Sequence, residues 1–267
     1  MSTALGPAYP QGRAGVIWGR LIRERSGGRL NVIVFPGATL VQRDPAREFG
    51  ALRDGAIDLA VGSATSWAAQ VVELNLIALP WLVRDFDALD LLLHGEVAMR
   101  LSAAVLAAGV LPLAWTGDGF RELATRREVQ LPADLTGLSL RVPSSPLLLE
   151  TLQALGATPV SMNAADALTA QRRGTLDGEE ISVAAYGTSR VYTAGFARLL
   201  VWQAHADALL FAINRAVWNR LSGADRELVL QAARDAARTV YDRWAAIIGS
   251  DLVRAAEAAV AAPPQGK

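Results

Sequence analysis

The amino-acid sequence predicts an α/β fold, because helical and strand-like segments alternate from its beginning. Apolar residues recur at helical spacing over 13–24, and a β-branched, mostly apolar run over 30–35 follows and ends at a Pro-Gly pair. A second helix is predicted over 44–53 and a second strand over 56–62. An apolar strand of this kind is typical of a sheet covered by helices.

The same alternation continues to the end of the chain. The pattern predicts helices over 88–108, 146–155 and 164–173, and strands over 110–116, 137–142, 157–160, 198–203 and 208–214. From Ser222 to about Val260 the composition is rich in Ala, Arg, Leu and Glu, and Ser222 and Asp225 have the spacing of a capping box. This segment is expected to form one long helix, or two helices broken near Gly249.

The overall composition excludes several classes of function. The chain has 267 residues, is 52% hydrophobic and carries 26 basic against 26 acidic residues, so it lacks the excess positive charge that phosphate backbones require. Nucleic acid is therefore not an expected partner. There is no cysteine, which excludes disulfides, thiolate metal sites and cysteine nucleophiles. No apolar run is long enough to cross a bilayer, so the chain itself is not expected to span a membrane.

Motifs for catalysis or cofactors are missing from the sequence. We find no Gly-x-Ser-x-Gly, Walker or His-Glu-x-x-His pattern, and no cofactor is expected. His94 and His205 lack the spacing of a metal site, and His205 is expected to make a structural contact. Three classes of function remain open at this point: a transport binding protein, a ligand-sensing module for a signalling partner, and a small-molecule enzyme.

Arg141 is the most informative single residue. It closes the predicted strand over 137–142, where apolar neighbours favour partial burial of a guanidinium group that keeps its charge. An anion is therefore expected beside it. For an isolated arginine a structural ion pair is the commoner interpretation, and a ligand carboxylate is the alternative.

Several segments, taken together, carry a resemblance to a known family. They follow in order along the chain: Ser26-Gly27-Gly28-Arg29-Leu30, Phe35-Pro36-Gly37, Leu52-Arg53-Asp54-Gly55-Ala56-Ile57-Asp58, Leu79-Pro80-Trp81-Leu82, the run 134–143, the run 155–162, Leu176-Asp177-Gly178-Glu179-Glu180 and the run 214–221. The chain resembles the DctP-type solute-binding proteins of TRAP (tripartite ATP-independent periplasmic) transporters, from about residue 2 to residue 250.

This resemblance implies a two-lobed periplasmic-binding-protein clamshell, each lobe a mixed sheet flanked by helices. Residues 1–118 and 207–243 would form lobe I, residues 119–206 and 244–267 lobe II, with the ligand cleft between them and a long C-terminal helix spanning both. The family's first strand would have to come from Ser2 to Leu5. Residues 1–7 have no signal-peptide pattern, so we expect any signal peptide to lie outside this sequence.

The resemblance also implies roles for individual residues. Arg141 matches the arginine that grips the ligand carboxylate through two parallel hydrogen bonds, and Arg121 matches a second cleft arginine. Ser144 and Ser145 precede a helix whose N-terminus favours an anion, although capping alone is an equal alternative. Because ligands of α/β sheets lie beyond the carboxyl ends of strands, Ser63 and the residues after it are also expected at the cleft.

Other candidates have weaker support. Trp67 is a possible cleft wall, with a core position as the commoner alternative. Glu180 is expected to be a structural or hinge hydrogen-bonding group, since Glu179 and Glu180 would point to opposite faces of a strand and rarely serve one centre.

Two positions depart from the family. Ile181 stands where many relatives have asparagine, and Ala164 where several have an aromatic residue. Both changes predict a ligand with one carboxylate and a more apolar or wider remainder than a C4-dicarboxylate. The expected partners are this organic acid and the TRAP membrane subunits, and the expected protein is a monomer located in the periplasm.

Overall fold

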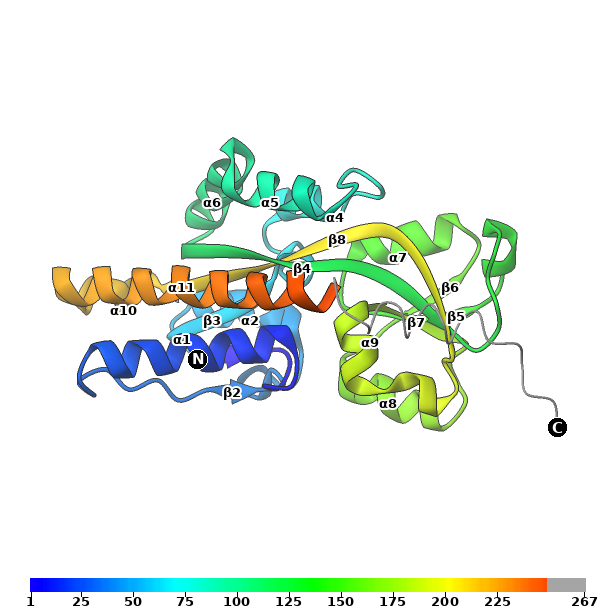
Figure 1. The fold of residues 1–267 in the computed structure, drawn as a ribbon, viewed down its shortest axis with the longest axis horizontal. Coiled ribbons are helices and arrows are strands. Elements are labelled where there is room, and N and C mark those ends of the chain that lie inside the picture. The colour runs from blue at the N-terminus through cyan, green and yellow to red at the C-terminus, as the bar shows by residue number, and fades with distance from the viewer. Residues whose placement is uncertain (249–267) are drawn as a thin grey trace. The chain divides into compact units, whose positions relative to one another are not determined.

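The computed structural model describes residues 1–248, which fall into two compact units joined by continuous strands. Unit 1 comprises Met1–Gly119 and His205–Tyr241, and unit 2 comprises Phe120–Ala204 with the segment that begins at Asp242. Eight strands form a mixed sheet in the order β2-β1-β3-β8-β4-β7-β5-β6 (Figure 1). Both long strands, β4 (Val110–Thr125) and β8 (Arg198–Asn214), contribute residues to each unit.

Unit 1 is built on parallel strands with one antiparallel neighbour. Strand β1 (Ser2–Thr3) pairs in parallel with β2 (Phe35–Pro36) and with β3 (Leu59–Ser63), and β3 pairs antiparallel with β8. The helices of this unit are α1 (Pro10–Arg25), α2 (Glu48–Arg53), α3 (Ala64–Trp67), α4 (Asn75–Ala78), α5 (Phe86–His94), α6 (Glu96–Ala107), α10 (Arg215–Arg220) and most of α11 (Gly223–Ile248). The predicted first strand from the N-terminal residues is confirmed.

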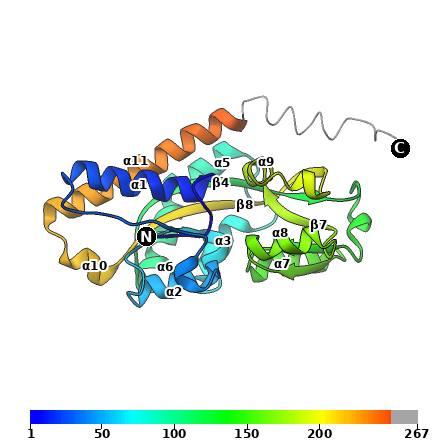
Figure 2. The ribbon, with the colours of Figure 1, turned by 90° about the horizontal axis from the view of Figure 1, so that it is seen from below.

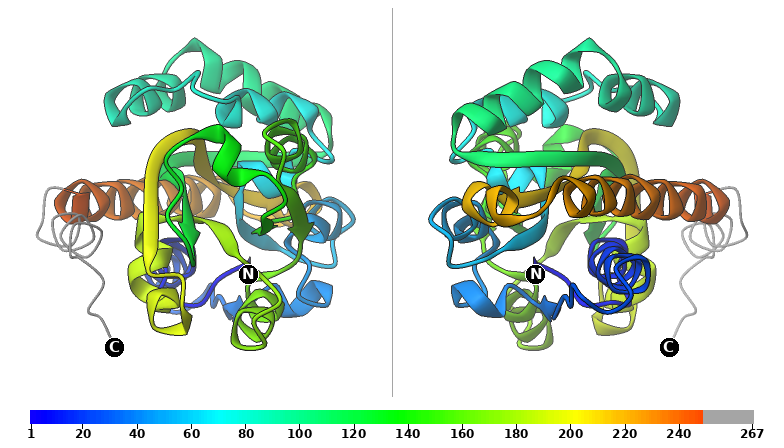
Figure 3. Two further views of the ribbon diagram at one scale, coloured as in Figure 1. Left: turned by 90° about the vertical axis from the view of Figure 1, so that its right-hand side faces the viewer. Right: turned by 90° about the vertical axis from the view of Figure 1, so that its left-hand side faces the viewer.

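Helix α1 lies beside α11 (Figure 3), and Trp18 of α1 contacts both α11 and β8. The side chain of Trp18 is completely buried, its ring meets the Phe211 ring edge-on at 5.4 Å, and its indole N–H donates to the Val229 carbonyl at 3.2 Å. Helix α11 begins where the sequence predicted, because the Ser222 hydroxyl accepts the Asp225 backbone N–H at 3.1 Å. The predicted break near Gly249 lies outside the described residues.

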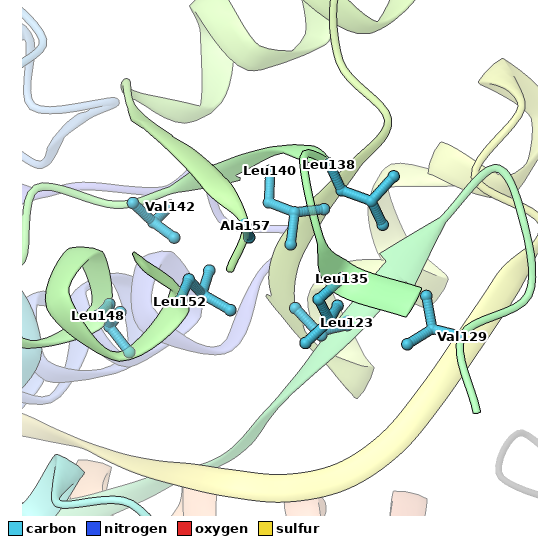
Figure 4. Packing of buried hydrophobic residues seen from close by; sticks show 9 residues of the cluster. All are labelled: Leu123, Val129, Leu135, Leu138, Leu140, Val142, Leu148, Leu152 and Ala157. Atoms are coloured by element: carbon cyan, nitrogen blue, oxygen red, sulfur yellow. The ribbon is translucent and has the colours of Figure 1, made fainter. Parts of the chain in front are cut away.

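Unit 2 also combines parallel strands with one antiparallel neighbour. Strands β7 (Gly178–Ser182), β5 (Ser139–Val142) and β6 (Thr158–Ser161) run in parallel, and β4 pairs antiparallel with β7. Helices α7 (Pro146–Ala154), α8 (Ala164–Arg172) and α9 (Val183–Ser189) belong to this unit (Figure 2). One buried cluster joins β4 and β5 to α7 (Figure 4): Leu123, Val129, Leu135, Leu138, Leu140, Val142, Leu148, Leu152 and Ala157. The predicted α/β class is thus confirmed, and the strands of both units belong to a single mixed sheet rather than to one sheet for each lobe.

The predicted strand over 30–35 is wrong except at its last residue. Pairing involves only Phe35 and Pro36, because β1 offers two residues as a partner. Before them, the N-terminal amino group of Met1 donates to the Ile33 carbonyl at 2.9 Å, and side chains alternate between half-buried and exposed. A β-branched run forms a regular strand only where a neighbouring strand of equal length accepts its hydrogen bonds.

Other element boundaries also differ from the prediction. The helix over 88–108 is two helices, because the backbone at Gly95 is extended. The segment over 44–53 starts with a short 3₁₀ turn before α2. The strand over 110–116 continues to Thr125, and the strands over 198–203 and 208–214 are one strand.

A buried carboxylate explains why β8 continues where its sequence turns polar. Gln203 has a left-handed φ of 48°, which locally interrupts regular strand geometry. The Glu122 carboxylate accepts the backbone N–H groups of Trp202 at 2.8 Å and Gln203 at 3.0 Å. Burial raises the pKa of Glu122, and these two hydrogen bonds oppose that rise. The side chain therefore supplies acceptors that the strand ladder does not.

Glu48 is expected to make the free energy of unfolding depend on pH. It is 1% exposed, the Ser2 hydroxyl donates to it, and burial raises its pKa from 4.5 to about 7. The folded state therefore holds this proton more tightly than the unfolded chain. Its stabilising contribution is complete below pH 4.5 and is lost as pH rises to about 7, a change of about 3 kcal/mol in the free energy of unfolding.

Urea unfolding at several pH values, compared with Glu48→Gln, measures this effect. The free energy of unfolding of the wild type, relative to the variant, should fall from about pH 4.5 to about pH 7 and then level off. A constant difference across that range would contradict a protonated Glu48 in the folded protein.

Candidate functional site

Strand β5 holds Arg141 on the face of the unit 2 sheet opposite the cluster shown in Figure 4. Leu140, the preceding residue, belongs to that cluster, and successive side chains of a strand point to opposite faces. On the neighbouring strand β7 the residue paired with Arg141 is Glu179. Arg141 is one residue from the carboxyl end of β5, where α/β sheets bind ligands.

The Arg141 guanidinium is buried but only partly engaged. Arg141 is 8% exposed, and its Nε donates to the Met162 carbonyl at 2.9 Å. Its Nη1 lies 4.0 Å from Oε2 of Glu179, too far for a hydrogen bond. Within residues 1–248, Nη1 and Nη2 donate no hydrogen bond to protein. These two adjacent nitrogens of the planar guanidinium group, called the Arg141 fork below, are therefore available to donate hydrogen bonds to an anion.

Burial and neighbouring charges act on this pair in opposite directions. Burial lowers the pKa of Arg141, whereas the charge of Glu179 raises it. Burial raises the pKa of Glu179, and the charge of Arg141 opposes that rise. An arginine keeps its proton in proteins, so Glu179 is the group of the two whose protonation can change.

The second predicted arginine has a dedicated partner. Arg121 donates from Nε and Nη2 to the two carboxylate oxygens of Glu180, with Nη2 to Oε2 at 2.7 Å. Glu180 is fully buried and lies beside Leu123 in the strand register, on the face of Leu140. Glu179 and Glu180 thus point to opposite faces, as predicted, and each has its own arginine. Contact between Arg121 and a ligand stays a prediction.

Two of the three predicted serines, Ser63 and Ser145, are the N-cap residues of helices. The Ser145 hydroxyl accepts the Leu148 backbone N–H at 3.4 Å at the start of α7, and the Ser144 hydroxyl accepts from Ser161 at 3.4 Å. In unit 1, the Ser63 hydroxyl caps α3 by accepting the Ser66 N–H at 3.3 Å and donates to Asp207 at 2.6 Å. Capping is therefore a sufficient explanation for Ser145 and Ser63.

The remaining predicted residues have diverse environments. Trp67 is completely buried, 5.5 Å from the Phe49 ring, so it belongs to the core of unit 1. Ile181 is buried in a second apolar cluster of unit 2 and shares its face with Glu179, two residues earlier. Ala164 is the exposed first residue of α8.

Sequence reasoning missed the place of Glu179 beside Arg141. Nothing in the local pattern indicates it, because the two residues are 38 positions apart and meet only through the parallel register of β5 and β7. Glu179 is 3% exposed, and its Oε1 has no hydrogen-bond partner among the described residues. A buried acceptor left in this way is rare in proteins and points to a functional contact.

Residues 1–248 also bear on metal binding and on membrane-spanning helices. They include no group of three or more His, Cys, Asp or Glu side chains arranged to hold a metal ion, and no helix long and apolar enough to span a bilayer. His205 is buried, with its Nδ1 2.7 Å from the Ala78 carbonyl, which confirms the structural contact predicted for it.

Comparison with known proteins defines the class. Residues 1–260 match the family model of bacterial extracellular solute-binding protein, family 7, also called DctP, so the chain belongs to this family. Members of the family are periplasmic solute-binding proteins of TRAP transporters, and the predicted resemblance is confirmed.

Individual relatives agree with this assignment. A solved TRAP periplasmic solute-binding protein from Ralstonia eutropha H16, with bound (S)-2-acetolactate, is 40% identical to this chain. The match covers 98% of this chain and 98% of that protein, with a TM-score of 0.88. Another from Sulfurospirillum deleyianum, with bound succinate, is 25% identical, with coverages of 96% and 82% and a TM-score of 0.86.

A curated relative, the uncharacterized protein y4mM of Sinorhizobium fredii, is 30% identical over 232 residues. The match covers 86% of this chain but only 42% of that protein.

Proposed function

We propose that this protein captures a small organic acid in the periplasm and delivers it to the membrane subunits of a TRAP transporter, acting as a monomer without catalysing a reaction on the acid. Family membership supports the transport role, and the relatives solved with acetolactate and succinate support a carboxylate ligand. The observation that carries the proposal is the Arg141 fork, whose two terminal nitrogens donate to no residue within 1–248.

Arg141 holds the ligand carboxylate in this proposal. Nε is fixed by the Met162 carbonyl, so the plane of the guanidinium is set before the ligand arrives. Such preorganisation reduces the entropy lost on binding. A carboxylate accepts two parallel hydrogen bonds from this fork, which the single ammonium of lysine does not offer.

Binding is coupled to closure in the proposed mechanism. The two units act as lobes, and the acid favours the closed arrangement to the extent that its affinity for the closed form exceeds that for the open form. The membrane subunits then recognise the closed form. Arg121 and Glu180 form an ion pair within unit 2, and contact between Arg121 and the ligand stays a prediction.

The proposed ligand is a monocarboxylate with a 2-hydroxy or 2-oxo group and a branched apolar remainder. The apolar Ile181 on the face of Arg141 and the small Ala164 support this class. The Ralstonia eutropha protein, which binds a branched 2-hydroxy acid, is 40% identical to this chain.

Calorimetric titration of the whole chain with a panel of acids tests this proposal. (S)-2-acetolactate and 2-hydroxyisobutyrate are expected to bind at least about tenfold more tightly than succinate, a difference of about 1.4 kcal/mol, because a second carboxylate would be left without a partner in an apolar environment. Preferential binding of succinate or of sialic acid would refute the proposed ligand class.

A further inference from the structure

The following inference concerns Glu179 and rests on the proposed function, in which an acid binds Arg141. The strand register places Arg141 and Glu179 side by side on one face of the sheet, with Nη1 and Oε2 4.0 Å apart. They attract each other without a hydrogen bond, so the carboxylate does not occupy the donors of the fork. An acid can therefore reach Arg141 while Glu179 stays in place.

The charges around this position balance before a ligand is present. Arg141 stands against Glu179, and Arg121 is neutralised by its two bonds to Glu180. A bound monocarboxylate would add one negative charge to a buried region that holds no further positive charge from these residues. An uncompensated charge in such a region is strongly unfavourable, and a titratable neighbour removes that charge by changing its protonation state.

Glu179 is the titratable group nearest to the incoming charge. The elements packed around it bring Arg141 from β5, Arg121 from β4, Glu180 from β7 and the uncharged Gln171 from α8. Both arginines keep their protons, and both carboxylate oxygens of Glu180 already accept hydrogen bonds from Arg121. Oε1 of Glu179 has no hydrogen-bond partner among the described residues, so an atom is free to carry the proton.

We propose that Glu179 takes up one proton from solvent when an organic acid binds Arg141, so that the site holds the acid anion and the proton together. The carboxylate of Glu179 becomes a carboxylic acid, and the ligand carboxylate replaces it as the partner of Arg141. The new O–H group is a donor, which can bond to an oxygen of the ligand instead of repelling it.

The direction of the expected pH dependence follows from the charges. Burial already raises the pKa of Glu179 in the free protein, and Arg141 opposes this rise. A ligand anion bound to Arg141 cancels that opposition and raises the pKa further. Between the pKa of the free protein and that of the complex, binding consumes a proton, so affinity falls as pH rises, by at most about tenfold per pH unit.

Calorimetry of the whole chain with (S)-2-acetolactate measures the proton directly. The binding enthalpy is determined in two buffers of different ionisation enthalpy at several values between about pH 6 and about pH 8, where ordinary carboxylates and the ligand do not titrate. The wild type should take up as much as about one proton and lose affinity with rising pH. Glu179→Gln should bind with no uptake and no slope, and more tightly than the wild type at about pH 8.

Glu150→Gln, an exposed substitution on α7, is the matched control and should behave like the wild type. Acid binding by the wild type without proton uptake would overturn this inference and leave the proposed function standing. The same uptake in Glu179→Gln would also overturn it. Failure of every acid in the panel to bind would overturn the proposed function and this inference with it.

Discussion

Arg141→Ala is expected to weaken acid binding by about 3 kcal/mol or more, which is at least roughly a hundredfold in the dissociation constant. The reason is that the ligand carboxylate would be desolvated without the two donors that replace its water. Arg141→Lys should also weaken binding, by less, because one ammonium keeps the charge and loses the parallel geometry. Isothermal titration with (S)-2-acetolactate measures both variants.

Controls separate this effect from misfolding. Removing Arg141 leaves Glu179 buried without its attracting charge, so the double variant Arg141→Ala with Glu179→Gln is compared by thermal unfolding. Arg173→Ala, an exposed arginine of the same unit, should bind as the wild type does. Unchanged affinity in a folded Arg141→Ala would exclude Arg141 as the carboxylate anchor.

Glu180→Ala is expected to lower the free energy of unfolding by about 3–5 kcal/mol, because Arg121 would keep its charge in a position from which water is largely excluded. The Arg121 side chain is 12% exposed and that of Glu180 is fully buried. Urea unfolding measures the change, with Glu150→Ala as an exposed control whose effect should stay within about 0.5 kcal/mol.

A double variant, in which both members of the ion pair are replaced, makes this test specific to the pair. Replacing Arg121 and Glu180 together by Met and Leu should cost less than Glu180→Ala alone, since no buried charge remains unpaired. A loss below about 1 kcal/mol for Glu180→Ala would show that Arg121 is solvated well enough to stand alone.

Helices were predictable from the sequence where local signals define them. Helix α1, the start of α11 at Ser222 and helices α7 and α8 follow from apolar periodicity and capping residues, which act within a few positions of the chain. Strands were less predictable, because a strand depends on a partner that is distant in sequence. The run over 30–35 has the right composition and lacks that partner, while β8 passes through polar residues because Glu122 satisfies its backbone.

The sequence by itself determined the α/β class and the family, since each depends on residue types in a fixed order. The role of Arg141 as the ligand anchor stays a prediction from the sequence. Only the tertiary structure decided which carboxylate stands beside each arginine. Two adjacent glutamates look equivalent in the sequence, yet the alternation of β7 turns Glu180 to Arg121 and Glu179 to Arg141. Pairing across strands depends on register, and register is fixed by the packing of the whole sheet rather than by local sequence.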